Sequence, residues 1–303
     1  MAITKVEVSI NGVWSNCTKN VAGKWAVNPT APSITSFNRD GKYYPVTVRI
    51  TNDAGTVVTY DASDSTIGTS LRLQVKEKNK PVIALVTPTN GARVTNNKQP
   101  ITFKVTDETN GSGVKTSTVS LKIDGDTFNE SSTGMVKTAI TNGYQFVYTP
   151  QTALSNGDHT ITINAQDNDG NAATAVTASI KVDTVPPSLN ITSPTNGWIT
   201  NNKAFTLAGT TNDATSSPVT VTAKLNGTDV GSITVTNGAF SKALTGVEGN
   251  NTLVVTAKDA AGLSTPVTIN FKIDTSVPKI KSVSITPNPA DASSSVAIEL
   301  EIE

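Results

Sequence analysis

A short sequence motif that recurs along the chain constrains its fold more than any other feature. Residues 180–187 read Ile-Lys-Val-Asp-Thr-Val-Pro-Pro, and residues 271–278 read Phe-Lys-Ile-Asp-Thr-Ser-Val-Pro. A Ser-Pro or Thr-Pro pair follows each copy, at Pro194 and Pro287, and Pro88 marks a third such start. These prolines are 106 and 93 positions apart, close to the length of one small β sandwich. We therefore expect an array of modules.

Four segments follow from this spacing. Residues 81–184 (the second module) and 185–276 (the third module) are each long enough to bury a core. Residues 1–80 are predicted to be an N-terminal β module, a hairpin plus a sandwich-like part and a candidate docking domain. A polar run ends it at Pro81, and proline cannot carry a central strand onward. Residues 277–303 (the tail) have room for two strands and are predicted to be an incomplete module.

The second and third modules alternate apolar and polar residues, as a sheet with one wet face requires. Turn dipeptides such as Asp124-Gly125 and Asn142-Gly143 separate these runs, and no convincing helix is present. The expected strands are 101–105, 119–123, 144–148, 161–165 and 176–182 in the second module, and 205–207, 219–225, 233–235, 253–257 and 267–271 in the third.

The N-terminal module is predicted to begin with a hairpin. Asn11-Gly12 separates two alternating runs, and both residues accept the positive φ that a type I′ turn needs. Further strands are expected at 21–27, 46–50, 56–60 and 71–75.

Charge and cysteine content exclude several classes of protein. The chain has 24 basic and 24 acidic residues, which gives no electrostatic footprint for nucleic acid or an anionic membrane. Cys17 is the only cysteine, so no internal disulfide can form. The first ten residues alternate like a strand, unlike a signal peptide, and no stretch is apolar enough to span a membrane. We expect no nucleic-acid partner, no membrane insertion, and synthesis in a cytoplasm without classical export.

At the repeats, residues 81–290 resemble the bacterial immunoglobulin-like domains that are strung together in surface adhesins and phage tail proteins. This resemblance implies an all-β fold of tandem immunoglobulin-like β sandwiches with a short C-terminal β-hairpin tail. It is carried by the starts 87–91 and 193–197, the turn 167–171 with its partner 259–262, and the linkers 183–187 and 274–278.

Two flanking pieces, residues 9–14 with 23–25 and residues 285–303, look like virion proteins of phages of Gram-positive bacteria. They imply a non-enzymatic structural or decorating component of a phage particle or phage-like tail, located in the virion. Its expected partners are other virion or tail proteins, copies of itself, and host cell-wall glycan bound weakly at the cell surface. The alternatives are a fragment of a bacterial cell-surface adhesin and a carbohydrate-binding accessory module.

Catalysis has few residues to use. His159 is the only histidine and is expected to be a solvated turn residue. It lies far in sequence from Cys17, so we expect neither a Ser-His-Asp or Cys-His arrangement nor a His/Cys metal site. Carboxylate pairs for glycoside hydrolysis flank a cleft, whereas modules of this size offer loops. The chain is therefore predicted not to be an enzyme.

Calcium is the one cofactor that the sequence leaves open. It binds oxygen ligands, and Asp167, Asp169 and Asp183, or Asp107 and Glu108 in a neighbouring loop, could converge at a module junction. The third module weakens the idea, because alanines replace the equivalents of Asn168 and Asp169. The favoured interpretation is that these aspartates form turns by bonding their own backbone.

Aromatic side chains mark candidate contact surfaces. Trp198, in a loop, and the pair Tyr43-Tyr44 are candidates for contact with carbohydrate or the host, since aromatic rings make amphipathic platforms. Packing at the module interface is the favoured alternative for Trp198. Trp14 and Trp25 are predicted to be core or subunit-contact residues of the N-terminal module.

The tail has an alternating apolar row. A two-stranded hairpin is marginal alone in water, so this row must dock on another surface. We interpret it as an assembly surface, with an extension of the third module's sheet as the alternative. Its residues are Val296, Ile298, Leu300 and Ile302.

Overall fold

The computed structural model describes residues 1–33, 35–39 and 41–303. They divide into two compact units, Met1–Asp183 and Thr184–Glu303. Regular structure in the described residues is β strand apart from two short 3-10 turns, η1 (Gly68–Leu71) and η2 (Thr116–Thr118). None of the helical turns in these ranges has the length and apolar character to cross a membrane. The all-β prediction is confirmed.

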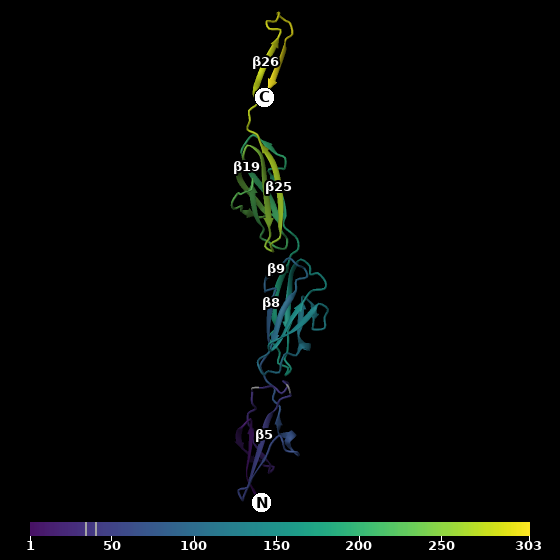
Figure 1. The fold of residues 1–303 in the computed structure, drawn as a ribbon, viewed down its shortest axis with the longest axis vertical. Helices are drawn as coiled ribbons and strands as arrows, with labels where there is room; N and C mark the ends of the chain where they lie inside the picture. Colours follow the sequence, from purple (N-terminus) through teal and green to yellow (C-terminus); the bar gives the residue numbers. More distant parts are fainter. Residues whose placement is uncertain (34, 40) are drawn as a thin grey trace. The chain divides into compact units, whose positions relative to one another are not determined.

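One antiparallel sheet forms the centre of the N-terminal module. Its strands are β1 (Ile3–Ile10), β2 (Val13–Asn16), β5 (Tyr44–Asn52; Figure 1) and β6 (Val57–Tyr60), in the order β2-β1-β5-β6. Asn11 and Gly12 have φ values of 50° and 85° and join β1 to β2, so the predicted hairpin is confirmed. In place of a second layer, the described residues form only short pairings: β7 (Arg72–Leu73) with β5, and β3 (Thr18–Lys19) with β4 (Trp25–Ala26).

Two strands predicted for this module are much shorter than expected. Where residues 21–27 were expected to extend, the side chain of Asn20 accepts hydrogen bonds from the N–H groups of Ala22 and Lys24, each at 3.0 Å. This local turn competes with strand formation and leaves β4 with two residues. Residues 71–75 fall short because η1 occupies their start and β7 ends at Leu73.

The second module is a two-layer sandwich. Apolar residues at alternate positions of its central strands point between the layers, and Phe103, Phe146, Leu121 and Ile161 are fully buried there. One sheet has the order β13-β14-β10-β8 and the other β12-β11-β15-β16-β9. The strands are β8 (Val82–Thr87; Figure 1), β9 (Ala92–Val94), β10 (Ile101–Thr106), β11 (Ser120–Ile123), β12 (Asp126–Phe128), β13 (Met135–Ile140), β14 (Gly143–Tyr148), β15 (Gly157–Asn164) and β16 (Val176–Val182).

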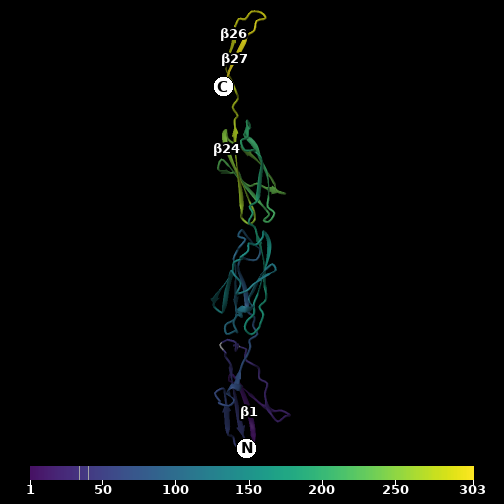
Figure 2. The same ribbon diagram turned by 90° about the vertical axis from the view of Figure 1, so that its right-hand side faces the viewer.

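The third module repeats this topology. Its sheets have the orders β22-β23-β19-β17 and β21-β20-β24-β25-β18, and the short β18 pairs parallel to β25 just as β9 pairs parallel to β16. Leu207, Leu253 and Ile273 are fully buried in a separate core. The strands are β17 (Ser188–Ser193), β18 (Ile199–Thr200), β19 (Ala204–Asn212), β20 (Thr220–Leu225), β21 (Thr228–Asp229), β22 (Val235–Thr236), β23 (Ala239–Thr245), β24 (Gly249–Lys258; Figure 2) and β25 (Ser264–Ile273). The predicted tandem sandwiches are confirmed.

The tail forms a two-stranded antiparallel ribbon of β26 (Ile280–Thr286) and β27 (Ala297–Ile302), which lie side by side in Figure 2. It is a sheet of its own and does not extend a sheet of the third module. Every residue of both strands is exposed.

Candidate metal centre between the N-terminal sheet and the second module

Three buried carboxylates meet where the N-terminal module joins the second module. Glu77 lies in the segment between β7 and β8, Asp107 directly follows β10, and Asp167 lies in the loop after β15. Each offers one carboxylate oxygen, and the three oxygens lie within 4.8 Å of one another. The fold therefore brings together residues that are up to 90 positions apart in the chain.

The loop after β10 holds Asp107 by a tight turn. Its Oδ2 accepts a hydrogen bond from the N–H of Gly113 at 2.7 Å, and Gly113 has the positive φ (83°) that glycine tolerates. A Cβ at Gly111 would lie 2.7 Å from that Oδ2, so the carboxylate occupies the space that a larger residue would need. The glycines of residues 107–113 thus aim the Asp107 side chain at the cluster.

The loop after β15 joins the two modules. Asp169 accepts a hydrogen bond from the N–H of Glu77 at 2.8 Å and another from the side chain of Asn38. Asn171 donates to the carbonyl of Glu77 at 3.1 Å and to Oδ2 of Asp167 at 2.7 Å. Both oxygens of Asp167 accept from Asn171, because its N–H also bonds Oδ1 at 2.8 Å. These bonds fix the backbone of Glu77 against the second module.

Two oxygens of the cluster have no hydrogen-bond partner among the residues that the structure describes. Glu77 is 6 % exposed; its Oε1 accepts from the hydroxyl of Ser112 at 3.2 Å, while Oε2 is buried without a hydrogen bond. Asp107 is 7 % exposed, and its Oδ1 is likewise buried without a bond. Across the described ranges, no lysine or arginine forms an ion pair with Glu77, Asp107 or Asp167.

The pKa values reflect this crowding of like charges. Burial and the facing carboxylate of Asp167 raise the pKa of Glu77 to about 7. Burial and the adjacent Glu108 carboxylate raise the pKa of Asp107 to about 6, although the N–H of Gly113 acts in the opposite direction. Buried carboxylates in such a group need a proton or a cation between them. All the donors are oxygens, which suit hard cations such as Ca²⁺ or Mg²⁺.

The structure does not bring all the predicted metal ligands to one place. Asp167 and Asp107 do meet, whereas Asp183 lies at the opposite end of the module: Gly157 pairs with Val182, and Asp167 follows the far end of β15. Asp169 bonds Glu77 and Asn38 beside the cluster, but it is not one of the three acids whose oxygens meet. Sequence reasoning missed Glu77, because an acid in the polar run before Pro81 gives no sign of burial.

The aromatic candidates fall into different environments. Trp198 is half-buried, and its ring packs against Phe205 and Phe271 in the third module's own core, with centroids 6.2 and 5.9 Å away. Tyr43 is exposed, and the guanidinium of Arg72 lies over its ring at 4.9 Å. Tyr44 begins β5, half-buried, with its hydroxyl buried. A role of these three residues in carbohydrate or host contact stays a prediction.

The two N-terminal tryptophans lie outside any large core. Trp14 on β2 is 42 % exposed, with the Arg49 guanidinium 4.3 Å from its ring centroid. Trp25 on β4 is half-buried. Their predicted role in subunit contacts stays open to test.

His159 is not a solvated turn residue, contrary to expectation. It lies on β15, 6 % exposed, with Nδ1 2.8 Å from Oδ2 of Asp124 and Nε2 2.8 Å from the carbonyl oxygen of Ser155. Burial alone would lower the pKa of His159, but the two acceptors raise it above its ordinary value. Both ring nitrogens are engaged within the module, so the ring acts as a structural crosslink.

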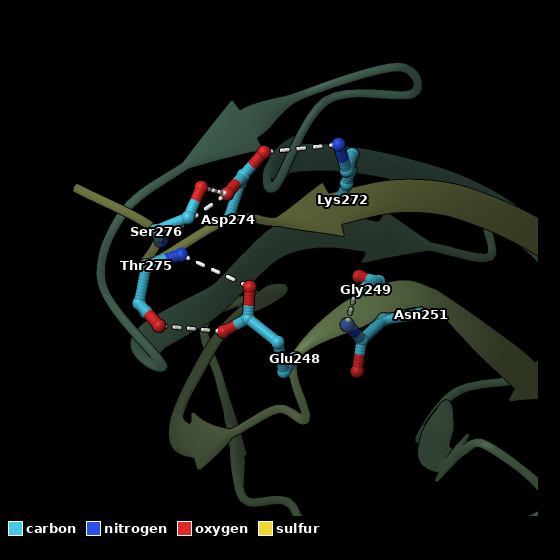
Figure 3. Close-up of polar contacts among 7 residues, drawn as sticks. All are labelled: Glu248, Gly249, Asn251, Lys272, Asp274, Thr275 and Ser276. Atoms are coloured by element: carbon cyan, nitrogen blue, oxygen red, sulfur yellow. Dashed lines mark hydrogen bonds and ion pairs between the residues drawn. The ribbon is translucent and has the colours of Figure 1, made fainter. Parts of the chain in front are cut away.

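The exit from the third module is fixed by a polar cluster (Figure 3). Glu248 accepts from the N–H of Thr275 at 3.0 Å and from its hydroxyl at 2.7 Å. Asp274 accepts from the hydroxyl of Ser276 and pairs with Lys272 at 3.0 Å, and these two contacts lower the pKa of Asp274 to about 2. The first residues after β25 are therefore bound to the module, and the tail begins beyond them.

Comparison with known families agrees with the two sandwiches. Residues 81–163 match the family described as "Bacterial Ig domain", and residues 187–275 match "Glucodextranase, domain B". Among curated proteins, none matches the chain.

Solved structures with similar folds have low sequence identity. The fibronectin(III)-like modules of Clostridium thermocellum CbhA share 18 % identity, over 63 % of this chain and 94 % of theirs, with a TM-score of 0.37. Drosophila OTK extracellular domains 3–5 share 11 %, over 89 % and 85 %, with a TM-score of 0.29. The Ig1-2 module of the Drosophila phosphatase DLAR shares 13 %, over 65 % and 100 %, with a TM-score of 0.26. The repeated sandwich topology and the family match of residues 81–163 show that the chain contains tandem immunoglobulin-like domains.

Proposed function

We propose that this protein is a non-enzymatic structural component of a phage particle or phage-like tail, and that it attaches to another protein of the particle through its tail. The observation that carries the proposal is the apolar face of the β26–β27 ribbon. Residues 285–303, which resemble virion proteins, include most of this ribbon, and the resemblance favours the same structural role. The immunoglobulin-like modules are then the displayed part of the molecule.

The ribbon has two chemically different faces. Residues directly opposite each other share a face, and the pairs Ile280/Ile302, Val283/Leu300 and Ile285/Ile298 form one apolar face. These six side chains are 44–65 % exposed. The pairs Ser282/Glu301 and Ser284/Glu299 form the polar face.

An isolated ribbon of this kind is marginal in water, because its apolar face buries nothing. A partner that covers the apolar face would supply the missing core. Val296, just before β27 and 43 % exposed, continues the apolar row. An assembly role for this row, proposed here for Val296, Ile298, Leu300 and Ile302, gives the tail a reason to be in the chain.

The displayed modules would make weak contacts with the host surface. Many copies on one particle raise the effective concentration of each contact, so low affinity per module is sufficient. Exposed Tyr43 and the edges of the sandwiches are candidate contact points, with cell-wall glycan as the candidate ligand.

A second candidate function rests on the match of residues 187–275 to domain B of glucodextranase. This match favours a carbohydrate-binding accessory module. The test is binding of the purified chain to polysaccharides, compared with a Trp198→Ala variant whose fold and Tm are measured in parallel, because this ring also packs in the third module's core. Saturable binding that the variant loses would favour this role over attachment to a particle.

The attachment proposal is tested on particles purified from a host that expresses the full chain. Leu300→Lys places a charge on the apolar face, and Glu299→Lys places the same residue on the polar face as the matched control. We expect the wild type and the Glu299→Lys chain to be incorporated, and the Leu300→Lys chain to be lost from particles but still folded. Recovery of the wild-type chain in the producing cell's envelope, and not on particles, would overturn the proposal in favour of an adhesin. Self-association of the free chain through this face would replace the partner protein with a second copy.

A further inference from the structure

We propose that Glu77, Asp107 and Asp167 bind a calcium ion, which fastens the N-terminal sheet to the second module. The inference does not depend on the role in a phage particle. Three segments supply one carboxylate each: the connection between β7 and β8, the loop after β10 and the loop after β15. A ligand set gathered from three such segments requires the folded junction.

The unpartnered oxygens point to a ligand. Oε2 of Glu77 and Oδ1 of Asp107 are buried and accept no hydrogen bond from any described residue, in side chains that are more than nine-tenths buried. Buried polar atoms are nearly always satisfied, and a buried charge without a partner is unfavourable. Their other oxygens already accept from Ser112 and Gly113, so Oε2 of Glu77 and Oδ1 of Asp107 are the oxygens left to bind an ion.

The oxygens are close enough for one cation to contact all three. Calcium–oxygen bonds are about 2.4 Å long, so the ligands of one calcium ion are at most about 4.8 Å apart. The three oxygens lie within 4.8 Å of one another. Carboxylates are hard oxygen donors, and the group includes neither a histidine nor a cysteine that would favour zinc or copper.

Calcium suits this environment better than magnesium. Magnesium demands near-ideal octahedral geometry and keeps several of its waters, whereas calcium accepts irregular sets of ligands. Here the three carboxylates come from a connecting segment and two loops, an irregular set of the kind that calcium accepts.

The consequence of binding is a stiffer junction. Asp169, Asn171 and Asn38 already bond across it, but these bonds bring Glu77 to two other carboxylates. The ion would replace the repulsion among the three carboxylates with attraction. Loss of the ion should therefore loosen the segment around Glu77 before it unfolds either module.

The experiment uses the full chain in EGTA, in Ca²⁺ and in Mg²⁺, with hydrogen exchange followed by mass spectrometry. The variants are Glu77→Gln and Asp107→Asn. The matched control is Glu130→Gln, which removes an acid from the same module where it pairs with Lys137. Calorimetric Tm is measured in parallel.

We expect Ca²⁺ to slow exchange in peptides that cover residues 74–80, 105–114 and 165–172, in the wild type and in Glu130→Gln. At a free Ca²⁺ concentration of about 100 times the Kd, the Tm of the part of the chain that holds the site should rise by about 5–10 °C. Glu77→Gln and Asp107→Asn should weaken binding at least about tenfold, since each removes one ligand charge. In EGTA the same variants should be at least as stable as the wild type, because an amide relieves the like-charge contact.

Three results would overturn the proposal. One is that Ca²⁺ leaves the hydrogen exchange of these peptides unchanged in the wild type, a result that needs no variant. Another is an equal Ca²⁺ response in the wild type and both variants, which would place the ion elsewhere. The third is equal protection by Mg²⁺ at the same concentration, which would remove the assignment to calcium.

Discussion

The His159–Asp124 pair allows a prediction that is specific to one module. Asp124→Asn keeps the shape of the side chain, and its amide oxygen can still accept from the N–H of Thr160, as Oδ1 of Asp124 does at 2.9 Å. It removes the charge that faces the buried imidazole 2.8 Å away. A charge-assisted hydrogen bond in a buried site contributes about 1.5–3 kcal/mol, and an exposed ion pair less than about 1 kcal/mol. Since His159 is 6 % and Asp124 53 % exposed, we expect a loss of about 1–2 kcal/mol.

The loss should depend on pH in a defined direction. The pKa of His159 in the folded chain lies above its ordinary value of 6.5, so the folded state holds the proton more tightly than the unfolded chain. The stabilisation is complete below pH 6.5 and disappears as the pH rises through the folded-state pKa. Burial raises the pKa of Asp124, but the hydrogen bonds from His159 and Thr160 lower it by more, so the net pKa lies below 3.8. At the acid end the stabilisation is present above pH 3.8 and is lost as the pH falls through the lowered value.

The assay is NMR of the single histidine. Its Cε1 proton gives one folded and one unfolded resonance in urea, and their areas give the free energy of unfolding of the second module directly. Titration in the absence of urea gives the folded pKa. The control is Asp158→Asn, which removes the neighbouring charge that pairs with Lys181 and leaves both imidazole bonds intact. The reasoning is refuted if His159 titrates at or below its unfolded value, or if the Asp124→Asn loss is the same at pH 5.5 and pH 9.

Three further predictions concern packing and turns. Leu121→Ala and Leu253→Ala each remove a fully buried side chain from a separate core, and each should cost about 3–4 kcal/mol in urea unfolding of its own module only. Asn251→Ala should lower the free energy of unfolding by about 2–3 kcal/mol, because this 2 % exposed side chain forms hydrogen bonds with Val247, Gly249 (Figure 3) and Asn226. Calorimetry should show a lower Tm for the third module, and an unchanged Tm would contradict the prediction. Gly143→Ala should cost about 2–3 kcal/mol, because its Cβ would lie 2.1 Å from the carbonyl oxygen of Val105, whereas Gly125→Ala, with open space around it, should change the Tm little.

The repeat in the sequence was sufficient to predict the architecture of the two sandwiches. Runs with strict alternation became central strands, such as β10 and β15, because burial of one face dictates a period of two. Edge strands gave no such signal: β13 is exposed along most of its length and includes Lys137, so its residues do not alternate. The short β9 and β18 are likewise invisible, since each adds to a sheet through its backbone.

The N-terminal module shows where local chemistry outweighs pattern. Residues 21–27 alternate as a strand would, yet the side chain of Asn20 bonds the backbone that a sheet partner would have used. The predicted solvent exposure of His159 is wrong for a different reason. Its position beside a turn suggested solvent, but β15 already begins at Gly157 and carries the ring inward. Periodicity predicts neither outcome, because both depend on specific hydrogen bonds, from the backbone to the Asn20 side chain and from His159 to a carboxylate and a carbonyl.

The acidic loops show why turn formation and ligand binding are not alternatives. The sequence favoured turn-forming aspartates, and Asp107 does cap its own loop through Oδ2. That bond leaves Oδ1 buried without a hydrogen-bond partner among the described residues. Asp259, which occupies the position of Asp167 in the third module, likewise uses Oδ1 on the N–H groups of Gly262 and Leu263 and leaves Oδ2 buried without a bond. A carboxylate has two oxygens, so a turn can hold one and present the other. An aspartate in a glycine-containing turn is therefore no evidence against a metal ligand.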